Sequence, residues 1–576
     1  MHVPTLSALP ASRETLSVFE GYHAGCRIRP GEFAAMENMS SDHYPLLATR
    51  KKRGVYRHPA NAQGLIARDS LCWVDGSKFV VNGYEVEMGL SEREADCPKR
   101  MVSIGAYVII FPDKKYINTL NLTDFGNLEA EFTTEGTVTL TPATSGGEAL
   151  LPAYSQPEEP QDPANMSLWL DTSQQPPVLL QWSQGSGMWV SVEKTYLRLS
   201  YPGIGAAFRE GDGISVTGAP QEVASQCVIT ARDADYLVVP GLLEGELLWN
   251  APITLSRRLP IMDFVIECEN RLWGCRYGPN SQGEIVNEIY ASKLGDFKNW
   301  YCFQGISTDS YQVSLGAEGP FTGAIQHMGY PLFFRENCLH KIYGSYPASY
   351  RLQTTPCRGV QQGSQQSLAI VGETLFYKSP TGVCAYDGAL PTEISRPLGP
   401  QPFFQAAAGA LRGKYYISMA DDEGQSHLFV YDTEKGLWHR EDGTKATCFC
   451  SCRNSLYFLD GEGRIISITG EGEPEEDFHY LAETGVLATE SPDNKHLSRL
   501  TLRLYLAPGA SMNLSVRYDE EPLWHSLASV HPGPLGSVTI PVAVRRCDHL
   551  RLRLEGTGEM RLYDLTKTLE EGSDVF

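Results

Sequence analysis

Short runs of aromatic and β-branched residues recur along the chain, and each run follows one or two turn-forming residues such as Gly or Asn. Each run has the length of a strand, and several are followed by a second strand-like run, so each predicts a β-hairpin. The pattern favours an all-β architecture over a helical one. Seven runs share it, at residues 70–74, 105–111, 270–274, 329–334, 372–377, 413–417 and 454–458.

The spacing of these runs indicates a repeat. Measured between one central residue of each run, the steps are 35, 165, 60, 43, 40 and 41 residues, and four of the six lie near forty. About forty residues is the length of one four-stranded blade of a β-propeller. Radial stacking lets each blade bury its faces against its neighbours and leaves only short exposed edges. We therefore predict a propeller of about seven blades, with two stacked β-sandwiches as the alternative.

The same spacing divides the chain into parts. One step exceeds a blade length by about 125 residues, which predicts a small β-barrel or sandwich inserted between the second and third blades. Strong apolar and polar alternation after the last blade predicts a C-terminal, jelly-roll-like β-sandwich. The expected parts are a leader (1–55), first blades (56–121), inserted domain (122–250), remaining blades (251–470), a solvated acidic linker (471–477) and the sandwich (478–576).

Charge and composition narrow the classes of function. The chain has 576 residues with 48 Lys and Arg against 69 Asp and Glu, a formal net charge of −21. Phosphate neutralisation needs clustered cations, so this balance argues against a free-standing nucleic-acid binder. The 14 cysteines are scattered without a repeating spacing and are expected to be reduced thiols. The opening segment lacks the pattern of a signal peptide and the longest apolar run is too short for a membrane span, which predicts a soluble chain made in the cytoplasm.

The segments that come nearest to known catalytic and cofactor motifs lack residues that those motifs need. The segment 409–415 is one residue short of a phosphate-binding loop and ends in Tyr, and the segment 203–208 lacks the third glycine of a dinucleotide fingerprint. Cys448, Cys450 and Cys452 alternate on a strand, where small buried side chains are a stronger interpretation than a metal site. We therefore predict no catalytic, cofactor or metal residues and no enzymatic activity. A glycan-cleaving propeller, which needs a pair of carboxylates, stays open as an alternative.

Segments in the leader, in the third ring-forming run and at the end of the chain carry a family resemblance. They resemble bacteriophage and prophage virion proteins of the tail-nozzle and head-to-tail stabilisation type, in which a leader with Tyr-Pro and Arg precedes a propeller. The segments are 19–25, 28–33, 38–47, 50–54, 270–274, 287–292, 545–548 and 556–574.

The resemblance implies a structural component of the tail or neck of a virion. Such a protein forms a ring with copies of itself around the DNA channel and contacts adjoining tail, neck or portal-proximal proteins, without specific nucleic-acid binding or membrane insertion. A negative lumen repels DNA over about 8 Å at physiological salt, which suits the acidic composition. The alternatives are a carbohydrate-binding or glycan-cleaving tail protein that acts on the host surface, and a cytosolic propeller scaffold of the host.

The leader is the expected site of contact with neighbouring subunits or partners. It carries polar and aromatic side chains with too little periodicity to form a core of its own. Its basic cluster at 50–53 is by default a solvated loop, with a contact to nucleic acid or to an acidic partner surface as the alternatives. The predicted contact residues are Tyr22, His23, Arg27, Tyr44, Pro45, Arg50, Lys51, Lys52 and Arg53.

Overall fold

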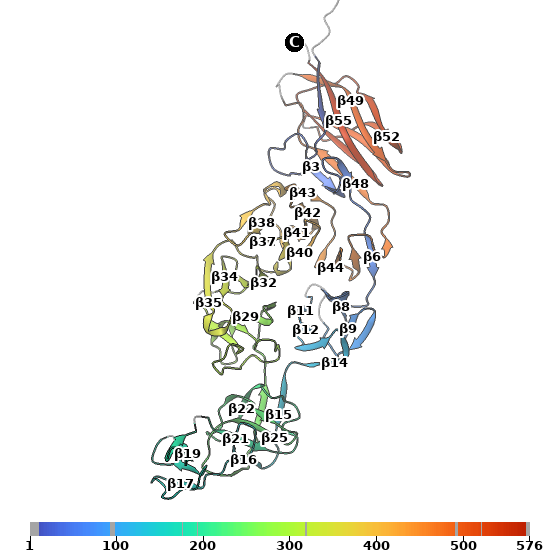
Figure 1. The fold of residues 1–576 in the computed structure, drawn as a ribbon. Helices are drawn as coiled ribbons and strands as arrows, with labels where there is room; N and C mark the ends of the chain where they lie inside the picture. The colour runs from blue at the N-terminus through green and yellow to red at the C-terminus, as the bar shows by residue number, and fades with distance from the viewer. Residues whose placement is uncertain are drawn as a thin grey trace, which may run out of the picture.

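The computed structural model describes residues 11–92, 98–175, 177–192, 194–316, 319–489, 494–519 and 521–571. Within these ranges the chain is built of β-strands, with short 3-10 helices η1 (Pro347–Ser349), η2 (Gln365–Ser367) and η3 (Arg396–Leu398). The prediction of an all-β chain is confirmed. None of the described residues forms a helix that is long and apolar enough to cross a membrane. The molecule is elongated, with a sandwich at one end, a ring of sheets in the middle and an inserted domain at the other end (Figure 1).

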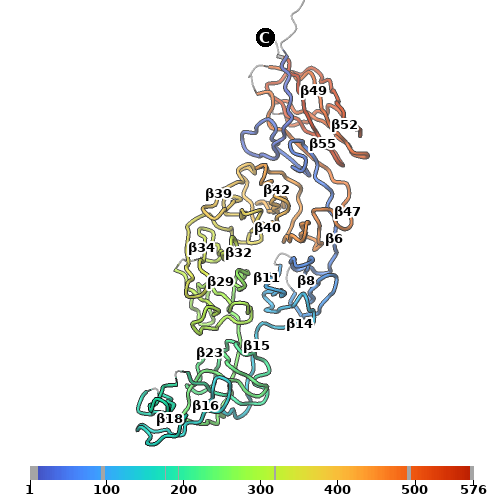
Figure 2. The backbone as a smooth tube through the Cα atoms, in the orientation of Figure 1, coloured from blue at the N-terminus to red at the C-terminus, as the bar shows by residue number. Residues whose placement is uncertain are grey.

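Seven antiparallel sheets of the described chain succeed one another around the middle of the molecule (Figure 2). The first strand of the seventh sheet contacts the first strand of the first sheet, so the ring is closed. The strands of sheets one to four are β7 (Ala62–Ala67), β8 (Leu71–Asp75), β9 (Lys78–Val81), β10 (Tyr84–Glu87); β11 (Arg100–Ile104), β12 (Tyr107–Phe111), β13 (Lys115–Asn118), β14 (Asn121–Asn127); β28 (Phe264–Cys268), β29 (Arg271–Pro279), β30 (Ile285–Ala291), β31 (Tyr311–Ser314); β32 (Gly323–His327), β33 (Tyr330–Phe334), β34 (Cys338–Tyr343) and β35 (Arg351–Pro356).

The seventh sheet joins segments from both ends of the chain. Its outer strand β6 comes from the leader and pairs with β46, so the two ends of the ring sequence are hydrogen-bonded to each other. The strands of sheets five to seven are β36 (Ala369–Val371), β37 (Thr374–Lys378), β38 (Val383–Tyr386), β39 (Thr392–Glu393); β40 (Phe404–Leu411), β41 (Lys414–Ala420), β42 (Ser426–Asp432), β43 (Leu437–Arg440); β44 (Ala446–Cys452), β45 (Ser455–Asp460), β46 (Ile465–Ser467), β6 (Gly54–Arg57) and the added β47 (Glu473–Pro474).

The seven aromatic runs of the sequence form the second strand of each sheet, namely β8, β12, β29, β33, β37, β41 and β45. A second strand has a hydrogen-bonded neighbour on each side and a packed sheet on each face, so its residues are apolar without alternation. The turn before it needs a left-handed backbone, which Gly and Asn adopt most readily. Gly105, Asn270, Gly329, Gly372 and Gly413 have φ angles of 55°, 60°, 78°, 62° and 75°. The Gly or Asn that opens five of the runs therefore marks a turn that the fold requires.

The inserted domain lies between the second and third sheets, as the long step predicts. Two of its sheets, with the orders β15-β27-β22-β23 and β24-β25-β21-β16-β26, enclose one apolar core. The domain runs from 130 to 257 because residues 121–127 form the fourth strand of the second ring sheet. The predicted limits of 122 and 250 are therefore corrected at both ends. Its strands are β15 (Ala130–Thr133), β16 (Val138–Ala143), β17 (Tyr154–Gln156), β18 (Leu168–Asp171), β19 (Val178–Ser183), β20 (Met188–Ser191), β21 (Tyr196–Ser200), β22 (Gly213–Thr217), β23 (Gln226–Val228), β24 (Ala231–Arg232), β25 (Tyr236–Pro240), β26 (Leu247–Trp249) and β27 (Thr254–Arg257).

The sandwich contains the first and the last strand of the described chain, β1 and β55. One sheet has the order β4-β5-β55-β49-β52 with β1 and β53 at its margin, and the other has the order β2-β3-β48-β54-β50-β51. Its strands are β1 (Ala11–Leu16), β2 (Gly21–Tyr22), β3 (Glu32–Glu37), β4 (Met39–Ser40), β5 (Leu47–Thr49), β48 (His479–Thr484), β49 (Lys495–Leu506), β50 (Ser511–Tyr518), β51 (His525–Val530), β52 (Gly533–Pro541), β53 (Arg546–Cys547), β54 (Leu550–Thr557) and β55 (Met560–Glu571).

The leader is an integral part of this sandwich. Phe19, Phe33, Met36, Met39 and Leu47 are buried in the same core as the C-terminal strands. The prediction of a separate leader without a core is therefore wrong. The leader lacks visible periodicity because β2, β4 and β5 are only two or three residues long. In addition, β1, β3 and β5 take partners from the far end of the chain, while β2 pairs with β3 and β4 with β5.

Two buried histidines of the ring predict a loss of stability in acid. Burial, and then the nearby Arg335, lower the pKa of His340 to about 4, and burial, and then Lys414, lower the pKa of His439 to about 4. The unfolded chain takes up these protons near pH 6.5 and the folded chain only near 4, so stability falls as the pH falls between these values. Each histidine contributes up to about 1.4 kcal/mol per pH unit in that window.

Urea denaturation at intervals between pH 7 and pH 4 measures this slope. The variant His340→Gln is expected to show a shallower slope than the parent protein, while His531→Gln, at an exposed position, leaves the slope unchanged. An equal slope in the parent and His340→Gln would contradict the assignment.

Candidate functional site

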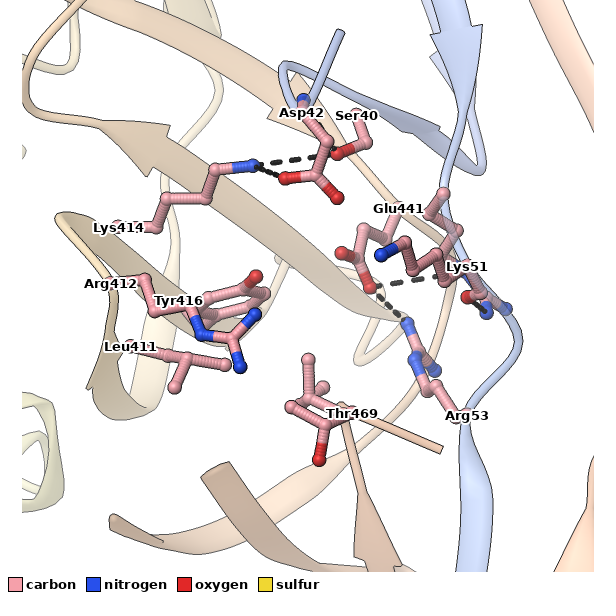
Figure 3. A pocket seen from close by; sticks show the side chains of 12 residues that line it. Ser40, Asp42, Lys51, Arg53, Leu411, Arg412, Lys414, Tyr416, Glu441 and Thr469 are labelled. Atoms are coloured by element: carbon pink, nitrogen blue, oxygen red, sulfur yellow. Dashed lines mark hydrogen bonds and ion pairs between the residues drawn. The ribbon is translucent and has the colours of Figure 1, made fainter. Parts of the chain in front are cut away.

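A polar pocket of about 300 Å³ lies where the leader crosses the sixth and seventh sheets of the ring, and we call it the junction pocket (Figure 3). The leader lines one side, the β40–β41 hairpin lines another, and the segments after β43 and β46 complete the wall. Its lining residues are Ser40, Asp42, Arg50, Lys51, Arg53, Leu411, Arg412, Lys414, Tyr416, Glu441, Ile468 and Thr469.

Two arginines of the leader anchor this segment to the ring and to the entry of the sandwich. Arg50 forms an ion pair with Glu475, and its Nε donates to Asn38 Oδ1 over 2.7 Å. Arg53 forms an ion pair with Glu441 and a second one with Asp442, in which Nη1 lies 2.9 Å from Oδ2. Both arginine side chains are only 5% exposed. We call these residues, Arg50, Arg53, Glu441, Asp442 and Glu475, the clamp.

The electrostatics of the clamp explain why buried charges are tolerated there. Burial would lower the pKa of Arg53, but Asp442 and Glu441 raise it above its ordinary value. Burial would raise the pKa of Asp442, but Arg53 prevails and lowers it. Arg53 and Asp442 are therefore each held in the ionised form by the partner of opposite sign.

The clamp corrects two expectations from the sequence. The basic cluster is not a solvated loop, because Arg50 and Arg53 are buried, and these two residues are not available for a contact with another subunit. The acidic segment 471–477 is not a free linker either. Glu473 and Pro474 pair with β6, and Glu475 belongs to the clamp.

Lys414 and Asp42 form a second fixed charge pair in the junction pocket. Lys414 Nζ lies 2.6 Å from Asp42 Oδ1 and 3.4 Å from Ser40 Oγ. Burial would raise the pKa of Asp42, but the hydrogen bond and charge of Lys414 prevail and lower it. The Asp42 carboxylate therefore stays ionised near neutral pH.

Three groups of the pocket remain open to a ligand. The Tyr416 hydroxyl has no hydrogen-bond partner within the described chain, although the residue is only 7% exposed. Arg412 has one weak contact, from Nη2 to the Asn454 carbonyl oxygen at 3.5 Å, and the Lys51 ammonium has no ion-pair partner among the described residues. Figure 3 shows the Arg412 guanidinium in front of the Tyr416 ring, facing Arg53 and Glu441 across the pocket.

A second pocket of about 460 Å³ adjoins the first and shares Asp42, Arg50 and Lys51 with it. It extends past Lys52 to the turns of the sandwich at 508–510 and 558–561. All four basic residues of the predicted cluster therefore line one or both pockets.

The other predicted contact residues lie elsewhere. Tyr22 packs on Phe429 with ring centroids 5.8 Å apart, and His23 Nδ1 accepts a hydrogen bond from the Gly25 amide. The Arg27, Tyr44 and Pro45 side chains are exposed, and none of these five predicted residues lines either pocket. Their role in subunit contact stays a prediction.

The ring side of the pocket was not among the residues predicted from the sequence. Arg412, Lys414, Tyr416 and Glu441 lie more than 350 residues from the leader and carry no motif. The available signal was Lys414, a charged residue at the start of an otherwise apolar second strand.

A smaller cavity of about 180 Å³ is lined by the first strands of several ring sheets and by η2. Its described lining includes Lys99 and Arg100 but no Asp or Glu. Lys99 Nζ pairs with Asp113 Oδ2 over 2.6 Å, and although burial would raise the pKa of Asp113, this hydrogen bond prevails and lowers it. The described part of this cavity therefore supplies no carboxylate pair for glycoside hydrolysis.

The alternating cysteines of β44 are packing residues. Cys448 and Cys452 belong to the apolar core between the seventh and first sheets. Burial raises the pKa of the Cys448 thiol to about 12, which leaves it protonated and a poor metal ligand. Among the described residues, no group of three or more His, Cys, Asp or Glu side chains could hold a metal ion.

No protein-family model matches the chain, and no curated protein matches its sequence. Solved structures do match. An exo-β-1,3-galactanase from Phanerochaete chrysosporium is 10% identical, with 53% of this chain and 94% of that chain covered and a TM-score of 0.20. A family 43 arabinoxylan arabinofuranohydrolase from Bacillus subtilis is 8% identical over 54% and 95%, with a TM-score of 0.17. PorZ, a surface component of the type-IX secretion system of Porphyromonas gingivalis, is 11% identical over 89% and 71%, with a TM-score of 0.24.

These matches correct one prediction from the sequence. The chain was expected to have no enzymatic activity, yet glycoside hydrolases are among the proteins whose structures match it. At this identity and these TM-scores, the matches assign neither an activity nor a catalytic residue to the chain.

Proposed function

We propose that the chain is a carbohydrate-binding tail protein of the bacteriophage type, and that it binds a sugar in the junction pocket. The observation that carries this proposal is the set of polar groups fixed around one pocket, with Asp42 and Glu441 as acceptors and Arg412, Lys414 and Tyr416 as donors. Sugar hydroxyls both donate and accept hydrogen bonds, so they need both kinds of group in one place. Ion pairs hold Asp42, Lys414 and Glu441 in position before a ligand arrives, which lowers the entropic cost of binding.

We propose further that the seven sheets are the blades of one seven-bladed β-propeller, with the sandwich and the inserted domain as its two additions. The closed order of the sheets and the position of the aromatic runs support this fold. The assignment to a phage tail rests on the family resemblance of the leader and of the segments at 270–274 and 545–574.

The junction pocket favours binding over cleavage of a glycosidic bond. A general acid must hold a proton near neutral pH, and this needs a raised pKa. The pKa of Asp42 is instead lowered, because the hydrogen bond and charge of Lys414 outweigh the effect of burial. Glu441 Oε2 is engaged by Arg53 and lies 3.9 Å from Arg50 Nε. Neither carboxylate is placed to protonate a leaving group.

Calorimetric titration with bacterial wall oligosaccharides, together with an assay for released reducing sugar, tests the proposal. The variant Tyr416→Phe removes only the open hydroxyl and is expected to weaken binding about tenfold, the effect of one hydrogen bond of about 1.4 kcal/mol. Tyr44→Phe, at an exposed tyrosine that lines neither pocket, is the matched control and should bind as the parent protein does. Absence of binding, or equal affinity of Tyr416→Phe and the parent, would contradict the proposal.

A second candidate is a ring-forming component of the tail or neck. The observation that favours it is the placement of the sandwich and the inserted domain at opposite ends of the molecule (Figure 1), which gives each a separate surface for neighbouring virion proteins. Electron microscopy and mass measurement over a range of concentrations should then show closed rings. Monomers at every concentration, and no immunogold label on purified virions, would contradict this function.

A further inference from the structure

We infer that the junction pocket binds an acidic sugar, one that carries a carboxylate in addition to its hydroxyl groups. This inference rests on the proposed function and specifies its ligand. It follows from the charges that the pocket leaves without a partner, from the position of one arginine, and from the acceptors that remain beside them.

The pocket has more positive charge than its own acids neutralise. Five cationic side chains line it, against the carboxylates of Asp42 and Glu441. Asp42 pairs with Lys414, and the acids of the clamp pair with Arg50 and Arg53. Lys51 and Arg412 remain without an ion pair. Because the clamp has three acids for two arginines, the groups at the pocket carry one net positive charge, in a chain whose net charge is −21.

Arg412 is held at the edge of the pocket by the geometry of its turn. It precedes Gly413 in the hairpin between β40 and β41, and the two residues have φ angles of 48° and 75°. A two-residue turn of this type fixes the backbone, and with it the direction in which the Arg412 side chain leaves the chain. The guanidinium is planar with donors arranged as a fork, which matches a carboxylate better than a single hydroxyl.

The remaining groups of the pocket suit hydroxyls rather than a second anionic oxygen. Glu441 uses Oε2 for the clamp, and Figure 3 shows its other oxygen turned towards the pocket. The Tyr416 hydroxyl is free to donate. A phosphate dianion would be repelled by the Glu441 and Asp42 carboxylates, whereas a monoanionic sugar can place its carboxylate at Arg412 and its hydroxyls at the acids. A neutral sugar would offer Lys51 and Arg412 no charged partner.

The test compares sugars that differ only at C6. Glucose and glucuronate, galactose and galacturonate, and mannose and mannuronate form three pairs in which a hydroxymethyl group is replaced by a carboxylate. Titration by calorimetry is expected to show that the acid of at least one pair binds about tenfold or more tightly than its neutral partner. This preference should shrink as salt is added, because the contact is charged and close to solvent.

Arg412→Gln is expected to abolish the preference for the acid without lowering the melting temperature, because the side chain is exposed. Arg453→Gln is the matched control. Arg453 also has a positive φ, 55°, and occupies the equivalent turn of the seventh sheet, but it does not line the pocket. It should keep the preference.

The outcomes separate the inference from the proposed function. Equal affinity for the acidic and neutral members of every pair, with binding retained, overturns the inference and leaves the proposed function intact. Absence of binding by any sugar in this panel and by the wall oligosaccharides overturns both. Acetate or inorganic phosphate that binds as tightly as the best uronate also overturns the inference, because the pocket would then bind simple anions.

Discussion

A chain that begins at Gly54 is expected to lose its folded sandwich, although it keeps every strand of the ring. The truncation removes five strands and the core side chains of Phe19, Phe33, Met36 and Met39, together with Leu47, each buried to 3% exposure or less. Each contributes about 2 to 3 kcal/mol through its burial, so their sum is comparable to the whole stability of a typical domain. Limited proteolysis should show rapid cleavage throughout 478–571 in the truncated chain and resistance in the full chain.

The matched control is a larger deletion elsewhere in the molecule. Ala130 and Arg257 face each other across the β15–β27 ladder, so the ends of the inserted domain are already adjacent. Replacing residues 131–256 with two glycines should leave the ring and the sandwich folded, with thermal unfolding of both retained. If the chain that begins at Gly54 instead keeps a protease-resistant sandwich, the leader is a separate contact segment, as the sequence alone suggested.

The ring could be predicted because each of its sheets contains a short stretch of sequence that identifies it. Each second strand is buried on both faces, and in five of the seven sheets it opens with a left-handed Gly or Asn, so burial and turn chemistry mark the same few residues in those sheets. The inserted domain followed from one irregular step in that repeat. Its limits were displaced because β14 (Asn121–Asn127) alternates in burial like a strand of a separate domain, although it is the outer strand of the second sheet.

The path of the leader could not be predicted because the residues that hold it in place lie far away in the sequence. Strands of two or three residues show no periodicity. The pairings that place the leader in the sandwich join residues more than 400 positions apart, as in the pairing of Leu47 with Leu562. The acids that bury Arg50 and Arg53 lie about 390 to 425 residues further along the chain. A basic cluster at the surface and one in a clamp have the same local sequence, and only the distant acids distinguish them.

One side of the candidate site could be predicted from the local sequence, and the other side could not. Its leader side was found from the basic cluster, since charge is visible in the sequence. The ring side depends on a hairpin turn and on Glu441, which directly follows the last strand of the sixth sheet, and neither has a pattern of its own. The pocket exists because the clamp holds the leader against these two elements, so the stability of the clamp and the shape of the pocket are coupled.

Arg53→Leu tests this coupling and is expected to destabilise the protein by about 3 to 5 kcal/mol, the usual cost of removing one partner from a buried ion pair. The change leaves the Glu441 carboxylate, whose side chain is 7% exposed, without its nearest cation. Lys52→Leu is the control, because Lys52 and Asp477 are 46% and 69% exposed and an ion pair of this kind contributes about 1 kcal/mol or less.

The double variant Arg53→Leu with Glu441→Leu separates an unpaired charge from lost packing. Replacing both partners by apolar side chains removes the buried charge, so we expect it to recover part of the lost stability in urea denaturation. It should not recover sugar binding, since the pocket loses Glu441 as well as Arg53. An Arg53→Leu variant as stable as Lys52→Leu would mean that the clamp does not hold the leader, and that the pocket is shaped by the turns of the ring alone.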